Sequence, residues 1–193
     1  MHNPTLSLIL TALLSLSATA APTTTAVTNS NPNLPTRSQP APRTTHTVVA
    51  GRGGLKFEPD NIVAEVGSVI EFHFLPANHS VVESSFSNPC QPKDRTSFFS
   101  GFFPVPAGSG KQSDEVFQVE VRDSRPIWFY CAQNNGNHCQ KGMTGVVNQN
   151  FDNQEFSLRR HREIAAGVTE PSGVQRYVQG GWRIPNPNPQ SGV

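Results

Sequence analysis

The sequence is poor in several kinds of residue, and each shortage narrows what the protein can be. Among 193 residues there are three cysteines and two methionines, and only 15% of the residues are charged, with a formal net charge of +1. This balance gives no electrostatic reason to expect nucleic acid or an anionic membrane as a partner. Hydrophobic residues make up 35% of the chain, beside 17 Pro and 15 Gly. Such a composition predicts a modest β-rich core with unstructured flanks.

The N-terminal residues have the pattern of a secretory signal. An apolar stretch at residues 6–16, too short for the roughly 20 residues of a membrane span, is followed by Ala18-Thr19-Ala20, which fits the small-x-small cleavage rule. We therefore expect a signal peptide over residues 1–20 and a secreted, extracellular protein whose disulfides persist. Residues 21–45 are rich in Thr and Pro, and we expect a disordered linker because they bury too little apolar surface.

Residues 46–150 have the periodicity of strands. In "VIEFHF" the apolar Ile70, Phe72 and Phe74 alternate with Glu71 and His73, and "EVFQVEV" alternates in the same way. The run "PIWFYC" is typical of a strand buried on both faces. Short strands separated by Gly, Pro and Asn clusters predict an all-β sandwich with one core. On the alternation, we expect His73 on the polar face, as a surface histidine.

Residues 151–193 are expected to form a largely irregular C-terminal tail. The stretch "SLRRHREIAA" could form a short helix, whose basic "RRHR" we expect to be solvated, but "GGWRIPNPNPQSGV" is broken by Gly and Pro. We find no apolar C-terminal stretch, and so expect neither a glycolipid anchor nor a membrane span.

The stretch "YCAQNNGNHCQKGM" concentrates the rare residues. Cys131, His138 and Met143 form a C-x6-H-x4-M pattern directly after the most apolar strand, and His79 stands at the end of the alternating strand. One thiolate, two imidazoles and a weak thioether are the ligands of a blue-copper electron-transfer site. The pattern therefore predicts one type 1 copper ion held by these four residues.

Each of these residues also has a simpler interpretation. Cys131 could pair with Cys90 or Cys139 in a disulfide, which would leave no thiolate. His138 could be a solvated loop histidine, Met143 could fill the core, and His79 could only terminate its strand. A zinc site made of Cys131, His138 and Cys139 is disfavoured, because two adjacent residues cannot easily converge on one ion.

The sequence resembles the cupredoxins, in particular the phytocyanin-like kind and the secreted cupredoxin-domain proteins of fungi. The resemblance rests on "LKFEPDNIVAEVGSVIEFHF", "NHSVVESSF", "NPCQP", "SGFFPV", "PIWFYC" and "HCQKGM". It implies a Greek-key β-sandwich, His79, Cys131, His138 and Met143 as copper ligands, and a disulfide between Cys90 and Cys139. The family usually has four residues between the Cys and the second His, whereas this chain has six. The two extra residues lie near Asn134 and Asn135. We expect the extra residues to bulge outward or to pull His138 off the copper.

The resemblance implies one-electron transfer as the function and no enzymatic activity of its own. We expect a monomer that exchanges electrons with a partner protein, for example a secreted multicopper oxidase such as a laccase. Two alternatives are a copper-free extracellular interaction module with the same fold and a protein that binds or scavenges copper without a redox role.

Overall fold

The computed structural model describes residues 43–190. The predicted signal peptide and most of the predicted linker lie outside this range. Within it, no helix has the length and apolar character needed to span a membrane.

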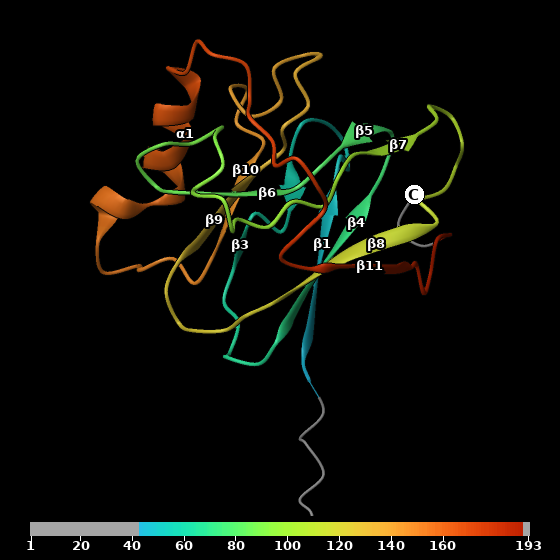
Figure 1. Cartoon of the computed structure of the whole chain (residues 1–193), viewed down its shortest axis with the longest axis horizontal. Coiled ribbons are helices and arrows are strands. Elements are labelled where there is room, and N and C mark those ends of the chain that lie inside the picture. Colours follow the sequence, from blue (N-terminus) through green and yellow to red (C-terminus); the bar gives the residue numbers. More distant parts are fainter. Residues whose placement is uncertain (1–42, 191–193) are drawn as a thin grey trace, which may run out of the picture. The chain divides into compact units, whose positions relative to one another are not determined.

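Strands form most of the regular secondary structure of residues 43–190, as predicted, and they form two main sheets and a small ribbon (Figure 1). The first sheet contains, in spatial order, β11 (Trp182–Pro185), β8 (Glu115–Glu120), β4 (Val69–Phe74), β1 (Thr45–Ala50) and β2 (Phe57–Glu58). The second contains β3 (Asn61–Ile62), β10 (Thr144–Val147), β9 (Ile127–Tyr130) and β6 (Val82–Ser84). The ribbon pairs β5 (Ala77–His79) with β7 (Phe103–Val105). The all-β sandwich is therefore confirmed.

Aromatic side chains join the two sheets. Phe57 and Phe72 come from the first sheet, and both pack edge-on against Phe129 of β9, with ring centroids 5.0 and 5.2 Å away. All three belong to the main core cluster, which also contains Cys131 and Met143. Two of the predicted metal ligands, Cys131 and Met143, thus lie in the core of the domain.

The predicted surface position of His73 is wrong. Its side chain is 5% exposed, and its Nε2 lies 2.7 Å from Oε1 of Glu71, which is 7% exposed. Nδ1 of His73 lies 2.6 Å from Oε1 of Gln112, which also accepts a hydrogen bond from Asn186. The residues after β11 therefore complete a buried polar network on the side of β4 that the alternation predicted to face water.

The C-terminal residues belong to the folded domain, so the predicted boundary at residue 150 is wrong. Much of residues 151–190 lacks helix or strand, as expected, but β11 pairs with β8 in the first sheet. The helix α1 (Leu158–Ala166) packs on the outer face of the second sheet, where Leu158 contacts Trp128 and Val146 (Figure 1). Pro and Gly break the sequence periodicity here without preventing the segment from packing.

The helix α1 is not solvated along all of its basic stretch. Arg159 and Arg160 are exposed, as predicted, and both pair with Glu163. His161, however, is completely buried, and its ring lies 4.8 Å from that of Trp128. Arg162 binds Asp60 and also donates to the carbonyl oxygens of Gly142 and Thr144. These two carbonyls flank Met143, so α1 holds the end of the predicted ligand loop.

We expect His161 to make the metal-free protein lose stability in mild acid. Burial lowers the pKa of His161 from 6.5 to about 4, against the opposing effect of its hydrogen bond to the Phe86 carbonyl. The unfolded chain therefore takes up a proton first, and the stabilisation present above pH 6.5 is lost as the pH falls towards 4. The expected contribution between pH 7 and pH 5 is about 2 kcal/mol.

Urea unfolding at both pH values measures this effect. The variant His161→Phe, which keeps a ring beside Trp128, should show a correspondingly flatter pH dependence than the natural chain. Equal slopes for the two proteins would show that folding does not lower the pKa of His161.

Candidate metal centre

The predicted ligands come from β5 and from the loop that joins β9 to β10. His79 is the last residue of β5, which follows the end of β4 at Phe74, so it does not terminate the alternating strand itself. Cys131 directly follows β9, His138 lies in the loop from β9 to β10, and Met143 directly precedes β10. The pairing of β9 with β10 brings the two ends of this loop together, since Cys131 N donates to Met143 O at 3.0 Å.

Three of these residues converge on one point. The potential ligand atoms of His79, Cys131 and His138 all lie within 4.8 Å of one another. Sγ of Cys131 is 3.8 Å from Nδ1 of His79 and 3.4 Å from Nδ1 of His138. Cys131 is completely buried, His79 is 2% exposed and His138 is 7% exposed, so His138 is the most accessible member of the cluster. The solvated loop position considered for His138 is excluded.

Met143 is completely buried and belongs to the same core cluster as Cys131. Its backbone N–H donates to His138 O at 3.0 Å, so the residue is fixed at both its N–H and its carbonyl oxygen. The position satisfies the core-filling interpretation, and the thioether as an axial ligand stays a prediction.

The environment of Cys131 favours a neutral thiol when no metal is bound. Burial raises the pKa of this thiol, and hydrogen bonds from Ser80 and from the backbone of Gln133 act in the opposite direction. Ser80 N donates to Sγ at 3.4 Å, and Ser80 Oγ accepts the N–H of Ala132. A metal ion that binds here must therefore displace the thiol proton, which makes its affinity depend on pH.

Both histidines are held in the neutral form that binds metals. Burial and, to a smaller extent, the neighbouring His138 together lower the pKa of His79 from 6.5 to about 4. Burial also lowers the pKa of His138, with a smaller effect from Lys141. At neutral pH each imidazole thus keeps a lone pair for coordination.

The cysteines are divided as the family resemblance implied. Cys90 and Cys139 form a disulfide with an S–S distance of 2.03 Å, and Cys131 is free. A disulfide that consumes Cys131 is therefore excluded, as is a zinc site that would use Cys139.

The six-residue spacing between Cys131 and His138 is accommodated by a compact turn. His138 N donates to Gln133 O and Asn137 N donates to Asn134 O, at 3.1 and 3.0 Å. Gly136 and Asn137 both have positive φ angles, of 92° and 51°, which reverse the chain towards the cluster. The extra residues thus leave His138 beside Cys131.

Comparisons with known proteins agree with this geometry. The chain is 36% identical over 137 residues to an "Extracellular serine-rich protein" of the fungus Arthroderma benhamiae, covering 69% of this chain and 49% of that protein, so it spans about half of that relative's length. It is 30% identical over 140 residues to the "Probable GPI-anchored cupredoxin-1" of the same organism, covering 72% of this chain and 68% of that protein. The chain belongs to the cupredoxin family. No family model matches the sequence.

Solved structures similar to this cupredoxin include a plastocyanin and a pseudoazurin of low sequence identity. Oxidised plastocyanin from Dryopteris crassirhizoma is 21% identical, with a TM-score of 0.35 over 53% of this chain and 97% of the plastocyanin. Pseudoazurin from Hyphomicrobium denitrificans is 17% identical, with a TM-score of 0.41 over 66% of this chain and all of the pseudoazurin.

The residues of this cupredoxin fit a single type 1 copper ion. A buried thiol between two neutral imidazoles, with a thioether residue in the same core, offers the soft and borderline donors that both oxidation states of copper accept. The donors come from β5, from the end of β9 and from one loop, and all are buried. Because the donors are buried, this environment suits a copper ion that keeps the same protein ligands in both oxidation states.

Sequence reasoning missed two residues that support the site of this cupredoxin. Ser80, next to His79 in the chain, bonds to Cys131 and Ala132 as described above. Gly51 lies against the His79 ring, and a Cβ at this glycine would be 2.4 Å from Nε2 of His79. The only sequence signal for Gly51 was the glycine-rich turn "GRGG" at residues 51–54. Repeated glycines indicate a backbone conformation that other residue types rarely adopt.

We expect Gly51→Ala to weaken copper binding by about tenfold or more, the scale of outer-shell substitutions. The added methyl group must displace the His79 ring, and the φ angle of 93° adds backbone strain. Gly53→Ala is a matched control in the same turn, because its φ is also positive, at 65°, but its Cβ would meet only the end of Lys56 at 4.0 Å. A Cu(II) competition titration should separate the two variants; equal affinities would show that the contact with the His79 ring does not weaken copper binding.

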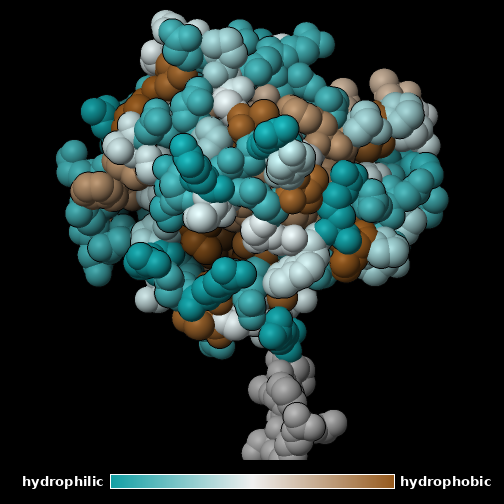
Figure 2. Space-filling model, viewed as in Figure 1, coloured by the Kyte–Doolittle hydropathy of each residue, from teal (hydrophilic) through white to brown (hydrophobic). Residues whose placement is uncertain are grey.

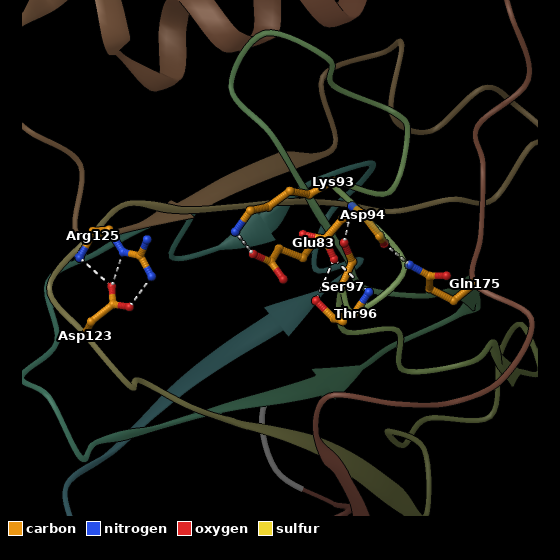
Figure 3. A network of polar contacts seen from close by, with 8 residues as sticks. All are labelled: Glu83, Lys93, Asp94, Thr96, Ser97, Asp123, Arg125 and Gln175. Atoms are coloured by element: carbon orange, nitrogen blue, oxygen red, sulfur yellow. Dashed lines mark hydrogen bonds and ion pairs between the residues drawn. The ribbon is translucent and has the colours of Figure 1, made fainter.

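A cleft of about 390 Å³ elsewhere on this cupredoxin contains none of the predicted ligands. Its charged residues largely neutralise one another: Lys93 pairs with Glu83, and Arg125 pairs with Asp123 (Figure 3). The Arg125 hydrogen bonds lower the pKa of Asp123 to about 2. We interpret the cleft as a surface feature of the sheet edge, unrelated to the metal centre.

Proposed function

We propose that the protein is an extracellular electron carrier whose single type 1 copper ion is held by His79, Cys131, His138 and Met143. The observation that carries the proposal is the convergence of Nδ1 of both histidines on the buried Cys131 thiol, at 3.8 and 3.4 Å. When bound, the copper ion supplies one-electron redox chemistry.

The chain's own residues have separate tasks in this proposal. Cys131 provides the thiolate, His79 completes the equatorial ligands and Met143 supplies the weak axial contact. His138 is the most exposed ligand, so its ring is where a redox protein could approach the centre. The partner we propose is another extracellular redox protein, and a multicopper oxidase fits this description.

Two observations support action outside the cell. The Cys90–Cys139 disulfide is of the kind that persists in oxidising compartments. One relative is named as extracellular and another as GPI-anchored.

The closed ligand set argues against catalysis by this chain. All three clustered ligands are buried, and Met143 is buried in the same core cluster as Cys131, so a substrate has no open coordination position to occupy. We therefore propose electron transfer to a partner in place of a reaction at the metal.

One equivalent of Cu(II) added to the metal-free protein tests the proposal. We expect an intense visible band from thiolate-to-copper charge transfer, which disappears with ascorbate and returns on reoxidation. Binding without reversible cycling would favour copper scavenging. No binding would favour an interaction module with the cupredoxin fold.

A further inference from the structure

We propose that residues 170–173 form a strap that fixes the ligand loop, and that Asn134 is the positioning residue through which this strap holds His138. The inference rests on the proposed copper site and adds to it a support that lies in the C-terminal segment.

Side chains of the domain hold the backbone of this strap at every residue. The four consecutive carbonyl oxygens of residues 170–173 each accept one hydrogen bond from a side chain elsewhere in the domain. The donors, in order, are Gln140 Nε2 at 2.9 Å, Gln91 Nε2 at 2.9 Å, Asn134 Nδ2 at 3.1 Å and Tyr130 OH at 2.8 Å. The strap has no helix or strand of its own, so these bonds replace the partners that a sheet would give its backbone.

The strap forms hydrogen bonds with the ligand loop on both sides of His138. Before this ligand, Asn134 donates to Ser172 O and accepts the N–H of Ser172 at 2.7 Å, so one side chain binds both backbone groups. After it, Gln140 donates to Glu170 O and accepts from Ser172 Oγ at 3.3 Å. The loop between these two anchors can therefore move less than its polar sequence suggests.

The strap also reaches the covalent and buried parts of the centre. Gly173 N donates to Cys90 O at 2.9 Å, and Cys90 is bonded to Cys139, the residue after His138. Tyr130, whose hydroxyl binds Gly173 O, directly precedes Cys131. Gly173 fits tightly here, since a Cβ would lie 2.3 Å from Oε1 of Gln91 and 2.9 Å from Cδ of Pro92.

This arrangement gives the lengthened loop a role. Asn134 belongs to the extra polar residues between Cys131 and His138, and its O also accepts the N–H of Asn137. A longer loop is free to take more conformations, and a side chain bound to a fixed strap removes part of that freedom. Asn134 therefore acts on the metal through His138 and does not touch it.

Asn134→Ala tests the proposal against the matched control Asn135→Ala. Asn135 is the next residue of the same loop, and its hydrogen bond to Gln133 uses only the backbone N–H, which the variant keeps. In the metal-free proteins we expect the amides of Asn137 and His138 to exchange with solvent about fivefold to tenfold faster in Asn134→Ala alone, from the loss of two hydrogen bonds. Asn134→Asp, which keeps the acceptor for Ser172 N–H, should lie between.

The copper-loaded proteins supply a second readout. Asn134→Ala should release Cu(II) to a chelator faster by a similar factor and alter the hyperfine splitting in its electron paramagnetic resonance spectrum, while Asn135→Ala matches the natural chain. A purely structural role would lower the unfolding midpoint and leave this splitting unchanged, which would overturn the positioning role.

Failure of the strap and failure of the copper site can be told apart. Equal amide exchange in Asn134→Ala and Asn135→Ala would overturn the strap, whatever the metal does. A natural chain that binds no copper would overturn the proposed function and with it the positioning role of Asn134, even if amide exchange in the metal-free loop responds as expected.

Discussion

Cys131→Ser should abolish the visible charge-transfer band completely and weaken copper binding by more than about a hundredfold, because even outer-shell substitutions cost 10- to 100-fold. The substitution replaces the one soft ligand with a hydroxyl group of similar size, which can still accept the hydrogen bond from Ser80 N. The thiol is buried, free and within 3.8 Å of both imidazole Nδ1 atoms, so no other cysteine can take its place. Absorption spectroscopy during a Cu(II) titration measures both effects.

His46→Ala is the matched histidine control for this experiment. His46 lies on β1, is half-buried and is not part of the ligand cluster, so the band should be unchanged. His73 would be a poor control, because its buried bonds to Glu71 and Gln112 make its removal a test of folding. A band that survives in Cys131→Ser would refute the assignment of the thiolate ligand.

The largest effect on stability should come from removing the disulfide. The double variant Cys90→Ala/Cys139→Ala opens a covalent loop with a sequence separation of 49 residues. Chain-entropy arguments for a loop of this size predict a loss of about 4 kcal/mol in the free energy of unfolding. Urea unfolding of the metal-free protein, followed by tryptophan fluorescence, measures the loss.

The same variant should also bind copper more weakly, because Cys139 directly follows His138 and its disulfide restricts the movement of this ligand. Cys131→Ala in the metal-free state is the control for a buried cysteine outside the bridge, and its unfolding midpoint should change much less. If the two variants unfolded at the same urea concentration, the disulfide would not be a main source of stability.

Figure 2 shows the hydropathy of one face of the domain. Apolar residues on this face form small patches separated by hydrophilic ones, without the broad apolar area that stable interfaces bury. A carrier that exchanges electrons needs only brief contacts, so a small surface near His138 is sufficient for the proposed function.

The sequence alone determined the fold class and brought the four candidate ligands together as a set. The apolar positions of β4 and β8 and the apolar run of β9 are buried as their patterns predict, although the polar positions of β4 are buried as well. The chemistry of Cys131, His138 and Met143 in one short loop is equally local, because their spacing is fixed by the chain itself.

Only the tertiary structure decided what surrounds these residues. His73 and His161 are buried because segments distant in the sequence pack over them. A local sequence pattern cannot predict burial by residues that are far away along the chain. The steric role of Gly51 beside His79 depends on the same kind of contact. The sequence could not reveal the strap at residues 170–173 for a related reason. Its carbonyl oxygens accept the four side-chain bonds, and every residue type has such a carbonyl, so only the fold shows which side chains bind them.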